Sequence, residues 1–337
     1  PRLEGWKIEC VGDDIAWMTV NEETGQLHAI NPENGFFGVA PGTSTRSNPN
    51  AMTNIEKDTL FTNVARTQDG DVWWKDMTKT PPKDLIDWHG NIWNPETDPE
   101  KAKSQPPAAH PNSRFTTPLA NCPIVDDRVN DPKGVPISAI IFGGRRPSLV
   151  PLVHEAFDWD HGVFMGTAIS SEETAAQART KTADGKPPIV HDPFAMGPFC
   201  GYNMSDYFKH WLSFGPKVGK NTKIYTVNWF RNGPGGANDF LWPGFGDNSR
   251  VLEWVFNRST GEASAVDTPI GRMPVPGAIN TSGLSPVPPM DELLAVDKAG
   301  WRAEVAQLKE YYATKFGDEL PSEITAQLNA LEQRLNQ

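Results

Sequence analysis

The sequence predicts an α/β protein in which helices cover a mixed sheet. Short apolar runs typical of buried strands, at 137–142, 163–168 and 223–230, alternate with segments of helical spacing at 150–159 and 202–214. The 29 glycines and 31 prolines among 337 residues exceed average usage, yet they stay below the roughly 25–30% that is typical of low-complexity disorder. We therefore expect a folded chain with many turns.

Two helices within 297–335 are the clearest elements. Asp297 can cap the first helix, and Gly317 can end it. Each helix carries an apolar stripe, and in the second the stripe has 4, 3, 4 spacing: Trp301, Val305, Leu308 and Tyr312, then Ile324, Leu328, Leu331 and Leu335. These stripes predict a helical pair packed on the core.

The first part of the chain has the pattern of strands and turns. Alternating residues predict strands at 8–12, 26–30 and 59–65, the first of which would deliver Gly12-Asp13-Asp14 to its end. A glycine-rich segment at 34–43 predicts a loop. Residues 78–112 are rich in Pro, Lys and Asp and predict a surface excursion.

Composition excludes several classes of function. With 31 Lys and Arg against 42 Asp and Glu, the net charge of −11 opposes nucleic-acid binding. No apolar stretch approaches the ~20 residues of a membrane span, so no membrane partner is expected. Cys10, Cys122 and Cys200 are odd in number and far apart, which favours free thiols in a reducing, cytoplasmic compartment. Three unpaired cysteines argue against a secreted, β-rich carbohydrate-binding protein, a class that the high Trp, Gly and Pro content would otherwise allow.

Three polar motifs can carry chemistry, and each has a plainer interpretation. Asp13 and Asp14 can hold a divalent metal near phosphates, or cap a turn. Gly143-Gly144-Arg145-Arg146 can bind phosphate or carboxylate, or form a turn in which one arginine pairs with a surface acid. The segment 112–114 offers an amide and a guanidinium group together.

An aromatic loop spans 228–250. Phe230, Phe240 and Phe245 can sandwich a planar base, with Asn248 at the edge of the base. Aromatic clusters are more often core, but the Gly and Pro content here favours a binding loop. The sequence contains no Gly-x-x-x-x-Gly-Lys-[Ser/Thr] phosphate loop, and no Gly-x-Gly-x-x-Gly or Cys-x-x-Cys motif.

Taken together, these segments resemble the C-terminal part of the GTP-dependent phosphoenolpyruvate carboxykinases. The resemblance runs from about residue 5 to the end of the chain. Six motifs in the family's order carry it: VGDDIAW at 11–17, NPENGFFGVAPGT at 31–43, HPNSRF at 110–115, FGGRRP at 142–147, HDPFAM at 191–196 and FLWPGFGDNSR at 240–250.

The resemblance implies a role for each matching residue. Asp14 would be a ligand of a catalytic Mn²⁺, supported by Asp13. Asn112, Ser113 and Arg114 would bind substrate, and Arg114 would also reach the γ-phosphate. Two arginines, Arg114 and Arg145, would be catalytic. Nucleotide contacts would come from a larger set: Arg114, Arg145, Phe230, Phe240, Phe245, Gly246, Asp247 and Asn248.

The resemblance also implies an activity and an organisation. The family converts oxaloacetate and GTP to phosphoenolpyruvate, GDP and CO₂, with Mn²⁺ for catalysis and Mg²⁺ or Mn²⁺ bound to GTP. It implies a monomer in which residues 1–337 form one nucleotide- and metal-binding domain. A mobile lid would fall at about 173–183, where Ala178 replaces a carboxylate often found there, so its latching contact departs from the family.

The large departure from the family concerns the front of the chain. The phosphate loop, the Lys and His that complete the Mn²⁺ site, and the N-terminal substrate domain are expected upstream of these 337 residues. We therefore expect a polypeptide of this sequence alone to be inactive and the natural protein to be longer. The alternative is a non-catalytic guanine-nucleotide-binding module or fragment derived from the same enzyme.

Overall fold

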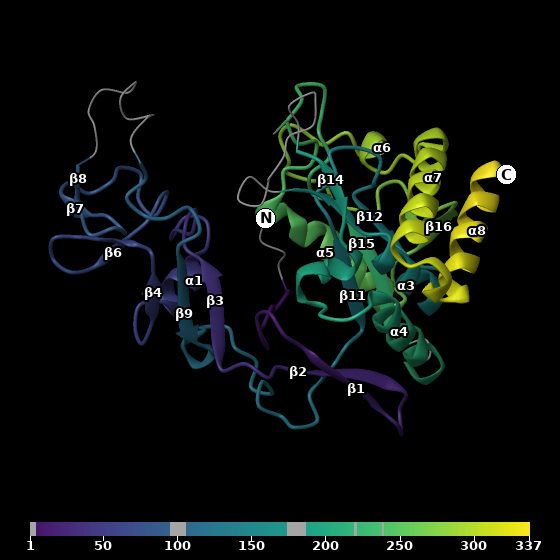
Figure 1. Ribbon diagram of the computed structural model, residues 1–337, viewed down its shortest axis with the longest axis horizontal. Helices are drawn as coiled ribbons and strands as arrows, with labels where there is room; N and C mark the ends of the chain where they lie inside the picture. The colour runs from purple at the N-terminus through teal and green to yellow at the C-terminus, as the bar shows by residue number, and fades with distance from the viewer. Residues whose placement is uncertain (1–4, 95–105, 174–186, 219–220, 238) are drawn as a thin grey trace. The chain divides into compact units, whose positions relative to one another are not determined.

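The computed structural model describes residues 5–94, 106–173, 187–218, 221–237 and 239–337 (Figure 1). The chain divides into two compact units. We call Val20–Leu27 with Pro136–Gln337 the C-terminal unit, and Gly5–Thr19 with His28–Val135 the N-terminal unit. The resemblance implies one domain over residues 1–337, and the structure divides this range into two units that each have a hydrophobic core.

The C-terminal unit is built on a five-stranded mixed sheet. Its order is β11 (Ala139–Gly143), β15 (Lys223–Val227), β12 (Val153–Glu155), β17 (Gly271–Pro274) and β16 (Ala265–Thr268). β11 and β15 are parallel, with Ala139 opposite Lys223, and the other neighbours are antiparallel. This arrangement confirms the predicted α/β class with a mixed sheet.

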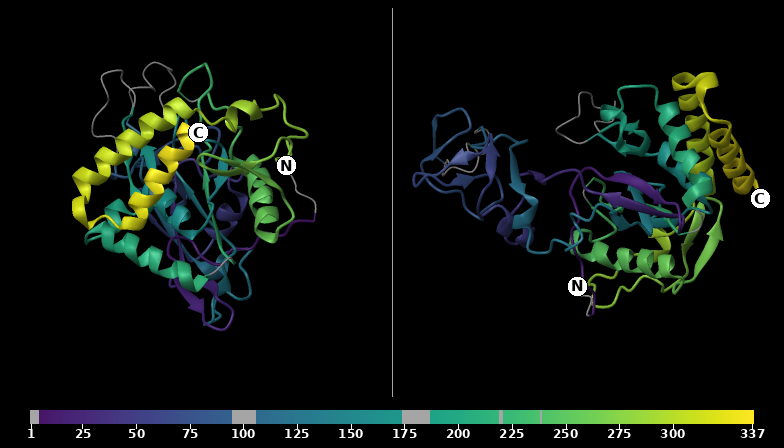
Figure 2. Two further views of the ribbon diagram at one scale, coloured as in Figure 1. Left: turned by 90° about the vertical axis from the view of Figure 1, so that its right-hand side faces the viewer. Right: turned by 90° about the horizontal axis from the view of Figure 1, so that it is seen from below.

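Helices cover both faces of this sheet. On one face, α5 (Asn248–Thr260) shares a core with Val153, Tyr225 and Val227. The other face is covered by four helices: α3 (Trp159–Thr167), α4 (Met204–Val218), α7 (Lys298–Lys315) and α8 (Ser322–Asn336). The last two, coloured yellow, lie side by side (Figures 1 and 2). The remaining elements of the unit are β13 (Ser170–Glu172), β14 (Ile189–His191), α6 (Met290–Leu293) and short 3₁₀ turns at 193–195, 197–199, 245–247 and 317–319.

The predicted C-terminal helices are confirmed. Asp297 caps α7, its Oδ1 accepting a hydrogen bond from the Ala299 amide at 3.0 Å. Val305, Leu308 and Tyr312 of α7 are buried, and so are all four residues of the predicted stripe in α8. The sequence-predicted helix at 202–214 and strand at 223–230 are confirmed as α4 and β15, with slightly different ends.

Two neighbouring predictions are wrong because the element types are exchanged. Residues 150–159, predicted as helical, contain the central strand β12, in which all three residues are buried. The segment 163–168, predicted as a strand, lies in α3 except for its last residue, and every residue of α3 from His161 to Thr167 is buried. An element that is apolar on all sides loses the periodicity that distinguishes a helix from a strand.

The boundaries between the two units fall within the strands of a three-stranded sheet. Its order is β1 (Trp17–Asn21), β2 (Gln26–Ile30) and β10 (Val135–Pro136). The predicted strand at 26–30 is confirmed as β2.

The N-terminal unit contains two small antiparallel sheets and the helix α1 (Pro49–Asn54). One sheet has the order β3 (Gly35–Val39), β9 (Arg114–Pro118) and β4 (Leu60–Thr62). The other has the order β6 (Val72–Trp73), β5 (Ala65–Arg66), β7 (Leu85–Ile86) and β8 (Ile92–Trp93), and a 3₁₀ turn follows β9 at 119–121. Their shared core includes Trp73, Trp74, Leu85 and Phe115.

Four sequence predictions in this unit need correction. The expected strand at 8–12 is reduced to an isolated bridge between Cys10 and Val125. The alternation at 59–65 is divided between β4 and the start of β5. The predicted surface excursion at 78–112 contains β7 and β8, with Leu85 fully buried, although part of it, 95–105, lies outside the described residues.

The predicted glycine-rich loop at 34–43 is largely the strand β3. Its glycines are required by close packing across the sheet. A Cβ on Gly35 would lie 2.3 Å from the carbonyl oxygen of Thr117, and a Cβ on Gly38 would lie 2.2 Å from the ring of Phe115. The glycines that suggested a loop therefore allow a neighbouring strand and an aromatic ring to approach the backbone.

We expect Gly38→Ala to lower the free energy of unfolding by about 1–3 kcal/mol, because the added methyl group overpacks the Phe115 ring. Urea denaturation of the full-length protein measures the change. Gly201→Ala is the control, since its Cβ would meet no atom within 4 Å. The control should shift stability by no more than about 0.5 kcal/mol, and equal losses in the two variants would contradict the packing argument.

Candidate functional site

In the N-terminal unit, the two adjacent aspartates have different surroundings. The Asp13 carboxylate accepts a hydrogen bond from the Phe37 amide at 2.9 Å, which fastens this turn to β3. The Ile15 amide donates to Glu33 at 3.3 Å and strengthens the same connection. The Asp14 side chain is exposed, and no hydrogen bond or ion pair of the described residues involves its carboxylate. Asp14 is therefore the aspartate with oxygens available to a ligand.

The fit of this turn to a metal can be tested on its donor set. An exposed carboxylate is a suitable oxygen ligand for Mn²⁺ or Mg²⁺. Among the described residues, however, no group of three or more His, Cys, Asp or Glu side chains is arranged to hold a metal ion. Asp14 thus fits as one ligand of such a set, with Asp13 holding the turn.

The second group of this unit, Asn112–Arg114, lies at the start of β9. Arg114 Nε donates to Asn112 Oδ1 at 3.1 Å, and its guanidinium carbon lies 5.1 Å from the centre of the Phe37 ring. Phe37 therefore contacts Arg114 through its ring and Asp13 through its backbone amide. Ser113 is fully buried, and its hydroxyl has no hydrogen-bond partner in the structure. Asn112 and Arg114 are the two side chains of this motif that remain available to a ligand.

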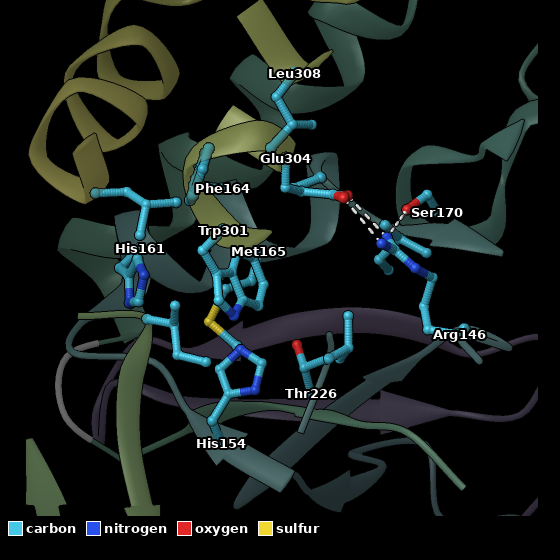
Figure 3. Close-up of a pocket in the computed structure, with 16 residues that line it drawn as sticks. Arg146, His154, His161, Phe164, Met165, Ser170, Thr226, Trp301, Glu304 and Leu308 are labelled. Atoms are coloured by element: carbon cyan, nitrogen blue, oxygen red, sulfur yellow. Dashed lines mark hydrogen bonds and ion pairs between the residues drawn. The ribbon is translucent and has the colours of Figure 1, made fainter. Parts of the chain in front are cut away.

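In the C-terminal unit, the two arginines after β11 have separate roles. Arg146 is buried and forms a bidentate ion pair with Glu304 of α7, with N–O distances of 2.8 and 2.9 Å. It also donates to the Ser170 hydroxyl, as Figure 3 shows. Arg145 instead lies over the Phe230 ring, with 4.0 Å between its guanidinium carbon and the ring centre. The motif thus contains one buried arginine, Arg146, that is paired with an acid. The second arginine, Arg145, remains available for an anion.

Glu304 is held as a carboxylate although it is buried. Burial alone would raise the pKa of Glu304. The hydrogen bonds and the positive charge of Arg146 outweigh burial, so the pKa lies below its usual range. The pair therefore contains two full charges with little solvent around them.

The predicted aromatic loop places two of its three phenylalanines together. Phe230 and Phe240 meet edge to face with ring centres 5.8 Å apart, and Phe230 also carries Arg145 on its face. Phe245 begins the short turn before α5 and is 69% exposed. Arg145, Phe230 and Phe240 therefore form one cationic and aromatic cluster, which we call the Arg145 cluster.

Asn248, the first residue of α5, follows this loop. Its Oδ1 accepts a hydrogen bond from Trp242 Nε1 at 2.8 Å. Because an indole N–H can only donate, the amide oxygen must face Trp242, and the Nδ2 group remains free to donate among the described residues. The Asp247 carboxylate already pairs with Arg250, with an N–O distance of 2.9 Å. Gly246 is exposed, and a Cβ added there would meet no atom within 4 Å.

The predicted lid at about 173–183 lies outside the described residues, apart from Glu173. Ala178 also lies outside them. The strands on either side are β13 and β14, which pair antiparallel. The Glu172 amide donates to the Arg145 carbonyl at 2.8 Å, and the Arg145 amide donates to the Ser171 hydroxyl at 3.0 Å. The backbone that presents Arg145 is thus joined to β13.

The sequence analysis missed Glu304 and Ser170. Glu304 lies three residues after Trp301 and four before Leu308, so it falls on the apolar stripe of α7. A charged residue on a buried stripe needs a partner of opposite charge, and this signal could have pointed to Arg146. The sequence offers no comparable signal for Ser170.

Comparison with known proteins now decides the family. A family model described as the phosphoenolpyruvate carboxykinase C-terminal P-loop domain matches residues 1–334. The chain belongs to this family. The chain lacks the Gly-x-x-x-x-Gly-Lys-[Ser/Thr] motif, although the family description names a P-loop.

Named relatives of this chain come from two bacteria and from cattle. It is 52% identical to phosphoenolpyruvate carboxykinase (GTP) of Chlamydia abortus, over 99% of this chain and 53% of that relative. It is 51% identical to the protein of the same name from Treponema pallidum, over 100% of this chain and 54% of that relative. It is 53% identical to the cytosolic enzyme of Bos taurus, over 100% of this chain and 52% of that relative. The chain spans about half the length of the curated relatives it matches.

Proposed function

We propose that the chain is the nucleotide- and metal-binding part of a GTP-dependent phosphoenolpyruvate carboxykinase. The reaction converts oxaloacetate and GTP to phosphoenolpyruvate, GDP and CO₂. The observation that carries the proposal is the Arg145 cluster, in which a guanidinium group lies over one of two aromatic rings that meet edge to face. The loop that carries both rings leads into α5, which begins at Asn248, and the Nδ2 group of Asn248 is free to donate among the described residues. A base and its phosphates need this combination of stacking, edge donor and positive charge.

The nucleotide is assigned to the C-terminal unit. Phe230, Phe240 and Phe245 would stack on guanine, and the Asn248 Nδ2 group would donate to its O6 oxygen. Gly246 and Asp247 would contribute backbone at the same loop. Arg145 would neutralise charge on the phosphates, as guanidinium groups do in phosphoryl transfer. These assignments correspond to a mixed-sheet nucleotide-binding domain, with the loop 228–250 as its guanine-binding loop.

The substrate is assigned to the N-terminal unit. Asn112 and Arg114 would bind oxaloacetate by amide and guanidinium hydrogen bonds to its carboxylates, and Arg114 would also reach the γ-phosphate. Loss of CO₂ from oxaloacetate leaves an enolate, and Arg114 would stabilise its negative charge. The enolate oxygen then attacks the γ-phosphorus of GTP, and the bond to the GDP oxygen breaks.

Asp14 would hold a divalent metal, with Asp13 keeping the turn in place. Mn²⁺, when bound, supplies positive charge to the reacting oxygens. The remaining ligands would come from residues outside this sequence, and Mg²⁺ or Mn²⁺ would accompany GTP. A lid at about 173–183 would exclude water and keep the enolate from being protonated to pyruvate.

Partners and compartment follow from the same proposal. Binding of GTP, GDP, oxaloacetate, phosphoenolpyruvate and CO₂ needs no macromolecular partner, so we propose a monomer. We propose the cytoplasm as its compartment, because the bovine relative is named cytosolic. No helix among the described residues has the length and apolarity to cross a membrane.

The activity can be tested on the full-length protein. With Mn²⁺ and oxaloacetate present, formation of phosphoenolpyruvate is measured with GTP and, separately, with ATP. We expect product with GTP and much less with ATP. Binding of GTP without any product would instead favour the non-catalytic nucleotide-binding module, and activity with ATP alone would contradict the guanine assignment.

A sharper test of the nucleotide site is Asn248→Asp. The aspartate keeps the oxygen that accepts from Trp242 but loses the Nδ2 donor and adds negative charge. We expect GTP binding to weaken about 10-fold or more, since losing a hydrogen bond and facing the O6 oxygen with a carboxylate costs about 1–3 kcal/mol. The preference for GTP over ATP should fall, because adenine carries a donor at that position.

Isothermal titration with both nucleotides measures these affinities. Asn257→Asp, which makes the same change on the same helix, is the control and should leave both affinities unchanged. Oxaloacetate binding should also be unchanged in Asn248→Asp, and equal losses for nucleotide and oxaloacetate would refute the assignment.

A further inference from the structure

A cavity lies within the C-terminal unit, and Arg146, the neighbour of Arg145 in the chain, is one of its lining residues. It is lined by strands β12 and β15, by α3 and by the C-terminal helices (Figure 3). Its volume, counted as the space open to the centre of a water molecule, is about 70 Å³. On that measure about 10–15 Å³ holds one water molecule, so several fit.

Four polar atoms at this cavity have no hydrogen-bond partner in the structure. They are Arg146 Nε, His154 Nδ1, Thr226 Oγ1 and Trp301 Nε1. Figure 3 shows these four side chains around the same space. Arg146 and His154 are 7% and 4% exposed, so bulk solvent does not satisfy them.

Their clustering is the unusual feature. A buried polar atom without a partner costs about 1–3 kcal/mol, and such atoms are few in folded proteins. The four atoms belong to four different elements, since His154 lies on β12, Thr226 on β15, Trp301 on α7, and Arg146 after β11. The register of the antiparallel strands β12 and β15 places Thr226 directly opposite His154. A shared ligand in the cavity would satisfy all of them together.

The charge of the site defines this ligand. Arg146 is neutralised by Glu304, which also lines the cavity. Burial lowers the pKa of His154 to about 4, so its ring is neutral near pH 7. Burial also lowers the pKa of His161, another lining residue, to about 3, and its Nδ1 already accepts from the Phe157 amide. A site without net charge disfavours ions and selects a small neutral molecule that both donates and accepts hydrogen bonds.

We propose that this cavity is an internal site for a cluster of water molecules, which completes the hydrogen bonding of Arg146, His154, Thr226 and Trp301. Water has the required size, neutrality and hydrogen-bonding capacity, and polar cavities of this kind are hydrated whereas apolar ones stay dry. The cluster joins α7 to β12 and β15 and supports Arg146 from the side that Glu304 leaves open. The site does not depend on the proposed carboxykinase reaction.

Thr226→Val tests the proposal through the sign of its effect. The replacement has nearly the same shape and removes only the hydroxyl. In a hydrated cavity it removes a partner of the water cluster, so the melting temperature should fall. In a dry cavity it removes an unpaired hydroxyl, so the melting temperature should stay the same or rise, and this result would overturn the proposal. Trp301→Phe, which removes the indole N–H, is expected to change the melting temperature in the same direction as Thr226→Val.

A direct observation keeps the proposal testable if a variant fails to fold. Crystals of the full-length protein are solved with and without xenon pressure. We expect ordered water within hydrogen-bond distance of Thr226 Oγ1 and Trp301 Nε1, and no xenon in the cavity. Xenon bound there, or a cavity without ordered water at high resolution, would overturn the proposal.

Discussion

Glu304→Ala is expected to lower the free energy of unfolding by about 3–5 kcal/mol, the usual loss when one partner of a buried ion pair is removed. The substitution leaves the Arg146 guanidinium buried and positive, and the Ser170 hydroxyl is then the one hydrogen-bond partner that its side chain keeps among the described residues. The lost interaction contains two hydrogen bonds, at 2.8 and 2.9 Å, between elements 158 residues apart in the chain. Urea denaturation of the full-length protein measures the loss.

A matched control comes from an exposed ion pair that also involves α7. Lys309 of α7 and Glu332 of α8 form an ion pair at 2.7 Å, but their side chains are 43% and 44% exposed. Glu332→Ala should therefore cost no more than about 1 kcal/mol, since exposed pairs contribute little. The double variant Arg146→Met with Glu304→Met should recover most of the loss, because neither charge is then buried alone. Similar losses from the exposed and buried glutamates would contradict this account of Arg146.

The same pair predicts a pH dependence. The pKa of Glu304 is lowered in the folded protein, so its contribution to stability is fully present above the unfolded value of about 4.3. That contribution is lost as the pH falls through the lower, folded value. Glu304→Gln removes the titrating group, so its stability relative to wild type should improve as the solution is acidified below pH ~4. A difference between the two proteins that does not vary with pH would count against the ion pair.

The helices that could be predicted from the sequence are those with local signals. α7 and α8 have one apolar stripe each, and α7 has a capping aspartate, so neighbouring residues alone specify them. β12 and α3 were exchanged because both are buried on all sides, and only their partners in the fold determine which one pairs in the sheet. β3 was taken for a loop because the reason for its glycines is the Phe115 ring, which lies far along the chain.

In the candidate site, too, the sequence predicts the residue types that a motif contains, but not the partners that reach it from distant parts of the chain. The Gly143–Pro147 motif predicted either an anion-binding arginine or an arginine paired with an acid. Arg146 is the paired arginine, although its acid, Glu304, is buried, and Arg145 lies over Phe230 and is left for the proposed anion-binding role. Glu304 and Phe230 both come from distant parts of the chain, so the motif alone could not assign the two arginines. Similarly, the Phe37 amide binds Asp13 and leaves the Asp14 carboxylate without a partner among the described residues, which is compatible with the metal role that the resemblance implies for Asp14.

Asp14→Asn is the second change with a large expected effect, and it follows from the proposed function. Asparagine has nearly the same shape but replaces a negative oxygen pair by a neutral amide, which is a much weaker ligand for a divalent cation. Because removal of an outer partner of a metal site already costs about 10–100-fold, loss of a direct ligand should lower turnover by about 100-fold or more. The Mn²⁺ concentration for half-maximal activity should rise.

Asp13→Asn is the matched control for this change. It keeps an amide oxygen that can accept from Phe37, so the turn should be preserved and the loss of activity should be much smaller than in Asp14→Asn. Binding of Mn²⁺ to the full-length protein, followed by electron paramagnetic resonance, separates ligand loss from a change in the turn. If Asp14 holds the metal, Asp14→Asn weakens Mn²⁺ binding while its melting temperature stays near wild type, since no hydrogen bond or ion pair among the described residues uses that carboxylate. Unchanged Mn²⁺ binding in Asp14→Asn, or the larger loss in Asp13→Asn, would remove Asp14 from the metal site.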